Sequence, residues 1–318
     1  MRGCSSPLEV NSLAAIRKLV TPEELSALHH LELVAPRVVD GLLTGTHRSR
    51  MKGGCSEFAE HRAYSPGDEI RTVDWRVVAK TDRYFIKQFH EESNLGVVLV
   101  LDASGSMGYG DSTRTKFLHA RAAAACLSRL VLGQRDPVAL SIARKKAPPF
   151  IPAHSSPGHL MTILDALIRL EPVWQNDLLS TLDWLIRNVR RRSQFVLLTD
   201  AFVEIEVLER LLLAVSARGH ELLLLHVLAP EELSFTFREN SRFRCLETAS
   251  TIDLDPVLFA DTYLAKMQTF IDRLRRACIR AGGDYEPLVT DQPLGNTLAD
   301  YLRRRARRSR RVASRRAG

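Results

Sequence analysis

Three oxygen-bearing side chains stand at alternate positions directly after an apolar run. Asp102, Ser104 and Ser106 follow the segment VVLVL, and a second apolar run, FVLLT, leads directly to Asp200. In extended backbone, side chains two residues apart point to the same side, so one carboxylate and two hydroxyls would face one way. Such hard oxygen donors suit Mg²⁺ or Mn²⁺, whereas zinc prefers the nitrogen and sulfur ligands that this stretch lacks. Asp102, Ser104 and Ser106 are therefore candidate metal ligands, with Asp200 as a direct or water-mediated fourth.

The same residues also have a purely structural interpretation. Aspartate and serine fill tight turns and cap helices, and a D-x-S-x-S pattern arises readily by chance. Its position at the end of a buried strand, with an aspartate after a second such strand, favours the metal site. Because Mg²⁺ keeps several waters and uses only one or two carboxylates, such a site would leave positions open for another ligand.

Apolar, strand-sized runs alternate with helical stretches from residue 96 onward. We expect strands over 97–101, 138–143, 195–199, 221–228 and 284–289, and helices over 113–132, 158–170, 177–190, 204–218 and 255–280. Strands that are apolar on both faces and separated by helices indicate a parallel sheet covered on both sides. The sequence therefore predicts an α/β fold with a doubly wound, mainly parallel sheet. Ligands of such sheets bind at the carboxyl ends of the strands, where Asp102 and Asp200 should meet.

The residues before the first aspartate have a different character. Residues 22–43 read as helical, 44–68 are polar and glycine-rich, and 83–90 alternate like a strand. We expect an N-terminal extension over 1–92, the α/β domain over 93–290, and a C-terminal helix with an arginine-rich tail over 291–318.

The positive charge is concentrated at the C-terminal end. The net charge is +8, but residues 303–318 hold nine arginines and no acid, and without them 36 basic residues face 37 acidic ones. The arginine run can bind nucleic acid, another polyanion or an acidic partner face. The alternative is a solvated, partly disordered end, which the lack of interleaved aromatic residues favours.

Several function classes lack their motifs. The chain has no G-x-x-x-x-G-K-[ST], no H-E-x-x-H and no G-x-S-x-G. The enzyme alternative is a Mg²⁺-dependent phosphatase-like hydrolase, but Ser104 stands where that chemistry needs an acid. The five cysteines are scattered, and no apolar run approaches the length of a membrane span, so we expect a cytoplasmic protein without a membrane span.

The most specific motifs lie within residues 47–92. They are S-E-F, with Glu57 and Phe58; R-x-Y-x-P-G-D, with Arg62, Tyr64, Pro66, Gly67 and Asp68; and R-x-x-D-W, with Arg71, Asp74 and Trp75. Followed by the aspartate–serine site, these motifs resemble the bacterial family called domain of unknown function 58. The stretch DASGSM resembles the metal-ion-dependent adhesion site of von Willebrand factor A domains.

This resemblance implies a function as well as a fold. It implies a von Willebrand factor A-like domain, a bound divalent metal, and a role as an adaptor or docking partner of MoxR-type AAA+ ATPases. In von Willebrand factor A domains an acidic side chain of the partner completes the metal shell, which agrees with the open positions inferred above. The expected function is a non-catalytic, Mg²⁺- or Mn²⁺-dependent protein-interaction module.

Some positions depart from the family pattern. Asn176 and Asp177 stand where the second metal loop of the family carries Thr-Asp, and Ser56 replaces a glycine. An asparagine carbonyl can still bind a hard cation, so Asn176 or Asp177 is a candidate fifth ligand.

The motifs before the site also have two interpretations. Pro66-Gly67 suits a type II turn, and Asp68, Arg71 and Asp74 can form ion pairs with Arg62 above a buried Trp75. The other interpretation is that these residues contact a partner.

Overall fold

The computed structural model describes the chain in several segments. They are residues 15–20, 57–63, 75, 77–78, 84–90, 95–111, 114–143, 148–156, 158–172, 177–238, 241–248 and 250–316. The chain forms two compact units, one of residues 47–94 and one of residues 1–46 with 95–318. Several predicted features lie outside the described residues: the helical stretch over 22–43, and Tyr64, Pro66, Gly67, Asp68, Arg71, Asp74 and Asn176.

A six-stranded sheet forms the centre of the larger unit. Its strands are β3 (Gly96–Asp102), β4 (Val138–Ala143), β5 (Phe150–His154), β6 (Ser193–Thr199), β7 (Glu221–Leu228) and β10 (Asp284–Val289). Their order is β10-β7-β6-β3-β4-β5, and only β5 runs antiparallel to its neighbour. The predicted mainly parallel sheet is confirmed, and β5 is an edge strand that the sequence pattern did not indicate.

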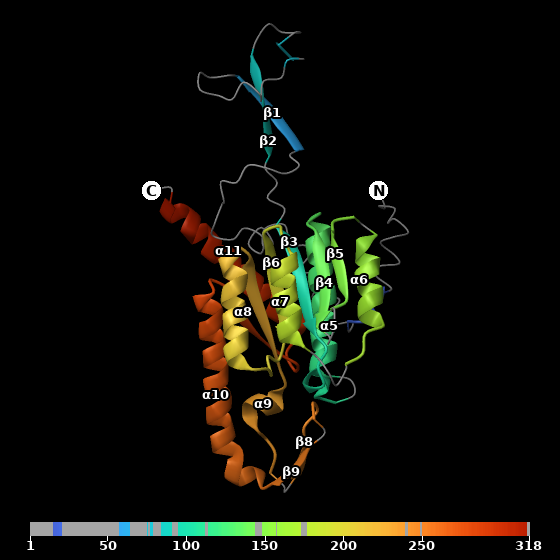
Figure 1. The fold of residues 1–318 in the computed structure, drawn as a ribbon, viewed down its shortest axis with the longest axis vertical. Helices are drawn as coiled ribbons and strands as arrows, with labels where there is room; N and C mark the ends of the chain where they lie inside the picture. Colours follow the sequence, from blue (N-terminus) through green and yellow to red (C-terminus); the bar gives the residue numbers. More distant parts are fainter. Residues whose placement is uncertain are drawn as a thin grey trace. The chain divides into compact units, whose positions relative to one another are not determined.

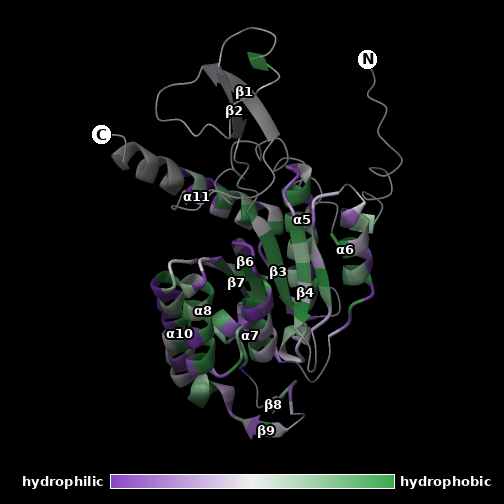
Figure 2. Cartoon of the chain, turned by 45° about the horizontal axis from the view of Figure 1, so that its top comes forward, coloured by the Kyte–Doolittle hydropathy of each residue, from purple (hydrophilic) through white to green (hydrophobic). Residues whose placement is uncertain are grey.

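Helices cover both faces of this sheet (Figure 1). One core contains residues of α5 (Lys116–Gly133), α6 (His159–Ile168) and α11 (Leu294–Arg316), and the other contains residues of α7 (Leu178–Asn188), α8 (Ile205–Ala217) and α10 (Pro256–Arg280). β3, β4 and β6 are buried along their whole length, which explains why their sequences are apolar on both faces. Figure 2 shows this hydrophobic centre and the mixed surface of α10. None of the described helices has the length and apolarity needed to cross a bilayer.

Part of the N-terminal region packs with the sheet. Ile16 is fully buried, and Leu19 and Val20 are nearly so, in the core that also contains α5 and α6. The larger unit therefore includes residues from the expected N-terminal extension.

Side-chain caps fix where the helices begin near the carboxyl ends of the strands. The hydroxyl of Thr115 accepts a hydrogen bond from the first turn of α5, so this helix begins later than residue 113, its expected start. Asp177 caps α7, and Asp255 caps α10 in the same way.

Two short elements after β7 were not predicted. They are α9 (Pro230–Ser234) and a hairpin formed by β8 (Ser241–Arg244) and β9 (Thr251–Leu254). Figure 1 shows both at the end of the unit where β7 finishes. Their short and partly polar segments give no clear periodicity, which is why sequence patterning overlooks them.

The arginine-rich end is folded where its side chains are described. Arg305 on α11 is 9% exposed, and its guanidinium donates to Asp284 over 2.8 Å and to Glu221 over 2.7 Å. The expectation of a solvated end is therefore wrong for Arg305, because it pairs with carboxylates on the first residues of β7 and β10.

The smaller unit contains an antiparallel pair of strands. β1 (Glu57–Ala63) carries Glu57, Phe58 and Arg62 of the sequence motifs, and it pairs with β2 (Phe85–His90). Trp75 is 59% exposed, and its ring meets Tyr84 edge-on with centroids 6.5 Å apart. The expectation that Trp75 is buried is wrong, because this edge contact leaves most of the ring open to solvent.

Candidate metal centre

The strand register brings two chain segments together at the carboxyl ends of β3 and β6. Leu101 of β3 lies opposite Leu198 of β6, so the residues that follow them, Asp102 and Thr199, are neighbours. The Thr199 hydroxyl donates a hydrogen bond to Asp102 Oδ2 over 2.5 Å. Asp200 follows Thr199 directly, so both predicted aspartates lie at the carboxyl ends of these strands, a region called the rim below.

Asp102 is also held by its own loop. The residue is 1% exposed, and its Oδ1 accepts a hydrogen bond from the Ser104 amide over 2.9 Å. The hydroxyls of Ser104 and Ser106 are 3.1 Å apart. The loop thus gathers one carboxylate and two hydroxyls, but not through the extended backbone that the sequence analysis expected, because Gly105 is helical and Ser106 begins a 3-10 turn.

The environment of Asp102 disfavours its ionised form. Burial raises the pKa of Asp102 to about 6, and the nearby charge of Asp200 adds to the rise. Hydrogen bonds from Thr199 and Ser104 act in the opposite direction. A cation beside this carboxylate would offset the cost of its negative charge.

Asp200 is paired with a buried lysine. Lys116, the first residue of α5, is 2% exposed, and its Nζ lies 2.8 Å from Asp200 Oδ2 and 2.7 Å from Glu232 Oε1. Burial alone would lower the pKa of Lys116, but the charges and hydrogen bonds of Asp200 and Glu232 outweigh it and raise the pKa. The other carboxylate oxygen of Asp200 accepts from the Phe202 amide over 3.2 Å.

The backbone turn at Asp200 is held from several sides. Ala201 has a φ of 55°, a left-handed conformation that is costly for an alanine. Its amide donates to the Thr199 hydroxyl over 2.8 Å, and His226 Nε2 donates to the Asp200 carbonyl over 3.0 Å. His226 Nδ1 then accepts from the Tyr285 hydroxyl, and burial lowers the pKa of His226 to about 4, so its ring is neutral.

Asp177 is occupied by helix capping. Its Oδ1 accepts from the Ser180 amide over 2.9 Å, and its Oδ2 accepts from the Ser180 hydroxyl over 2.6 Å. Asn176, beside it, lies outside the described residues. A ligand role for either residue stays a prediction.

Sequence reasoning missed several polar residues of this rim. Glu247, in the turn between β8 and β9, accepts a hydrogen bond on Oε1 from the Ser106 amide over 2.7 Å. Glu232 had a local signal, since its second oxygen accepts from the Ala229 amide in a helix-capping arrangement. Lys116, Thr199 and Glu247 reach this site only through contacts between residues far apart in the sequence. The residues missed are therefore these three and Glu232.

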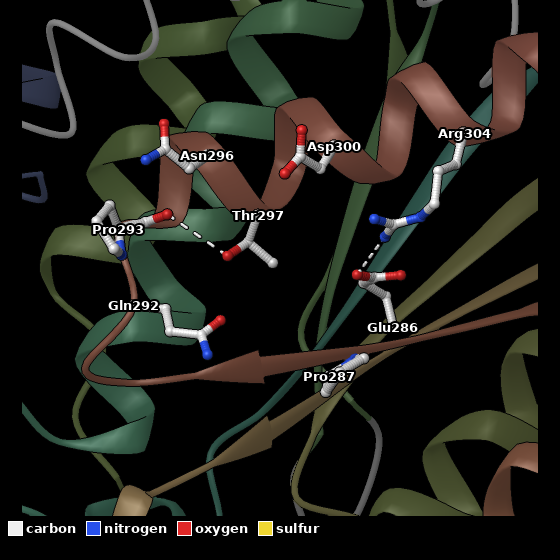
Figure 3. Close-up of a pocket in the computed structure, with 8 residues that line it drawn as sticks. All are labelled: Glu286, Pro287, Gln292, Pro293, Asn296, Thr297, Asp300 and Arg304. Carbon is white, nitrogen blue, oxygen red and sulfur yellow. Dashed lines mark hydrogen bonds and ion pairs between the residues drawn. The ribbon is translucent and has the colours of Figure 1, made fainter.

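A separate pocket of about 300 Å³ lies between β10 and α11 (Figure 3). Strands β7 and β6 stand between β10 and β3, so the pocket is not part of the candidate metal site. Its polar groups are partly engaged with one another, as in the ion pair of Arg304 with Glu286. The pocket is lined by Glu286, Pro287, Gln292, Pro293, Asn296, Thr297, Asp300 and Arg304.

A protein-family model and curated relatives match most of the chain. The model described as "Protein of unknown function DUF58" matches residues 60–261. The uncharacterized protein Rv1480 of Mycobacterium tuberculosis is 31% identical over 304 residues, which cover 93% of this chain and 91% of that protein. The uncharacterized protein Mb1516 of Mycobacterium bovis matches with the same identity and coverage.

Solved structures resemble the chain more distantly. An aerotolerance-related membrane protein from Bacteroides fragilis aligns with 15% identity and a TM-score of 0.43, covering 67% of this chain and 99% of that one. The VWA domain of SpRpn10 aligns with 11% identity and a TM-score of 0.39, covering 64% and 93%. These likenesses concern the fold only.

Replacing Asp102 with asparagine should change how stability depends on pH. The folded-state pKa of about 6 lies above the ordinary value of 3.8, so Asp102 favours folding at low pH, and this contribution is lost as pH rises through about 6. In EDTA, the free energy of unfolding of Asp102→Asn relative to wild type should increase by about 2 kcal/mol between about pH 4.5 and about pH 7.5. Urea titrations measure it. Asp183→Asn, an exposed change on α7, is the control, and an equal change in both variants would contradict the expectation.

Replacing Lys116 with methionine should destabilise the fold. The change leaves Asp200 and Glu232 without the ammonium that joins them, which should cost about 3–5 kcal/mol near neutral pH. Thermal and urea unfolding measure the loss, and a second change, Glu232→Gln, should recover part of it. Arg187→Met breaks an exposed pair on α7 and should cost less than about 1 kcal/mol. Equal losses in the two single variants would contradict the buried role of Lys116.

Proposed function

We propose that this chain, which belongs to the protein family of unknown function DUF58, is a non-catalytic protein-interaction module that docks a partner through Mg²⁺ or Mn²⁺. The metal would be held by Asp102, Ser104 and Ser106. Asp200 would contribute to metal binding through its charge or through a bridging water, because its carboxylate forms an ion pair with Lys116. When bound, the metal would supply a Lewis-acidic position for an oxygen ligand of the partner.

The donor set of the loop is the observation that carries this proposal. One buried carboxylate lies beside two hydroxyls that face each other at 3.1 Å, all at the carboxyl end of a parallel strand. These residues fit a hard divalent cation that uses few carboxylates and keeps its waters. In the described part of the chain, no three histidine, cysteine or acidic side chains form a metal-binding cluster, so the proposed donor set depends on the two serine hydroxyls.

The chemistry of the loop supports a binding role over a catalytic one. A phosphatase-like hydrolase needs a second acid two residues after the first aspartate, and Ser104 cannot take that part. His226 is hydrogen-bonded through both ring nitrogens, one to the Tyr285 hydroxyl and the other to the backbone carbonyl of Asp200. Neither group offers the general acid or base that hydrolysis requires.

The partner in this proposal is a protein with an acidic side chain. A site with one carboxylate and two hydroxyls leaves coordination positions that a carboxylate can fill. The resemblance to the family suggests a MoxR-type AAA+ ATPase as this partner, and the location that we propose for the interaction is the cytoplasm. The pairing of Arg305 with Asp284 and Glu221 favours a structural role for the start of the arginine run over polyanion binding.

Metal binding can be measured directly on the full chain. Electron paramagnetic resonance should detect a bound Mn²⁺ that Mg²⁺ displaces, because both are hard cations. Asp102→Ala and the double change Ser104→Ala/Ser106→Ala should each weaken Mn²⁺ binding by more than about tenfold, since each removes direct ligands. Asp183→Asn should bind as wild type does. Unchanged affinity in the loop variants would exclude this loop as the site.

The partner can be sought by affinity purification from the native host with mass spectrometry. Wild type in Mg²⁺ should retain an AAA+ ATPase that is absent with wild type in EDTA and with Asp102→Ala. The reason is that both controls remove the metal to which the partner would bind. Recovery of the same proteins in all three samples would mean that the D-x-S-x-S loop does not mediate the interaction.

A further inference from the structure

The turn between β8 and β9 lies directly over the D-x-S-x-S loop. Glu247, in this turn, accepts the hydrogen bond of the Ser106 amide over 2.7 Å, although the two residues are 141 positions apart. Glu247 forms no ion pair with the basic side chains that the structure describes, so none of these accounts for where its carboxylate lies. Its bond is to the loop that carries the candidate ligands.

The approach of the turn depends on a glycine. A Cβ added at Gly105 would lie 2.2 Å from the carbonyl oxygen of Leu246, far closer than such atoms can come. Gly105 has an ordinary helical conformation, with a φ of −59°, so its backbone angles do not require glycine. The lack of a side chain instead lets the backbone of the turn rest on the loop.

The hairpin that carries the turn is held independently of the central sheet. Among the described strands β8 pairs with β9 alone, and the amide of Cys245 donates to the carbonyl of Ser250 over 2.8 Å next to the turn. At its base, Phe243 packs against Phe237 with ring centroids 5.3 Å apart, and Phe235 packs against Tyr263 of α10 at 4.6 Å. The hairpin therefore presents Glu247 to the loop from a separately anchored element.

We propose that residues 245–248, which carry Glu247 between β8 and β9, are a built-in cover, and that Glu247 occupies the position the site offers to an acidic side chain of a partner. This inference rests on the function proposed above. A carboxylate of the chain and a carboxylate of a partner have the same chemistry, so they compete for the same loop. A partner must therefore displace the turn, and the class of partner is an acidic peptide segment.

The first test measures the cover without metal. In EDTA, Glu247→Gln and Glu247→Ala should speed hydrogen exchange of the Ser106 amide by about tenfold or more, because a charge-assisted hydrogen bond is lost. Gly105→Ala should do the same by lifting the turn with its carboxylate intact. Asp253→Asn, an exposed change on the same hairpin, is the control and should leave Ser106 unchanged. Unchanged exchange in Glu247→Gln would overturn the proposal.

The second test measures competition. The probe is a labelled peptide with the sequence of residues 243–252, and its control carries glutamine in place of the glutamate. In Mg²⁺, fluorescence anisotropy should show the peptide with the glutamate binding to the Glu247→Gln chain at least about tenfold more tightly than to wild type, since the internal competitor is lost. The control peptide should bind neither chain. Equal binding of the peptide to both chains, or binding to neither, would overturn the proposal.

The two proposals fail in different measurements. If Mn²⁺ binding does not depend on Asp102, the metal-dependent function is wrong, whereas exchange at Ser106 in EDTA still reports whether Glu247 covers the loop. If Mn²⁺ binding does depend on Asp102 but Glu247→Gln leaves the exchange of Ser106 unchanged, the metal site stands and the cover is wrong.

Discussion

Buried negative charge at one end of the sheet is the constraint on which this rim depends. Parallel strands end there, and the segments that follow them bring Asp102 and Asp200 into buried positions, with the partly buried Glu232 beside them. Ionised carboxylates in such a place cost several kcal/mol unless a cation or strong donors accompany them. The ammonium of Lys116 joins two of them, while hydroxyl and amide donors hold Asp102. The candidate ligands thus lie among groups that compensate the negative charge of the carboxylates.

The sequence was informative wherever the signal was local. Apolar runs of strand length indicate β3, β6 and β7, and the rule for parallel sheets then predicts that Asp102 and Asp200 lie at the same end of the sheet. Lys116 could not be predicted, because its partners are 84 and 116 positions away and nothing in its neighbourhood marks it. Arg305 looked like part of a solvated run because its two carboxylate partners lie on different strands.

The elements that the sequence did not indicate share a physical cause. β5, α9 and the β8–β9 hairpin are short and have no repeating pattern of their own; α9 begins at a local cap, whereas the two strand elements depend on tertiary contacts. The hairpin is the clearest case, since a small aromatic cluster with Phe243 and Tyr263 anchors it. The side chains of the D-x-S-x-S loop therefore follow a strand of the central sheet, whereas the β8–β9 hairpin above them lies outside it. Local opening costs the least free energy in such peripheral elements.

The rim is built from segments that are synthesised at different times during translation. Asp102, Ser104 and Ser106 are synthesised first, Thr199 follows with β6, and Glu247 comes later still, 141 positions after Ser106. Long-range contacts of this kind form only after large loops have closed. A nascent chain therefore exposes the aspartate and the two serines before the strand that supports them and the turn that lies over them exist. Until translation passes the hairpin, the loop is open to whatever cation or chaperone it meets.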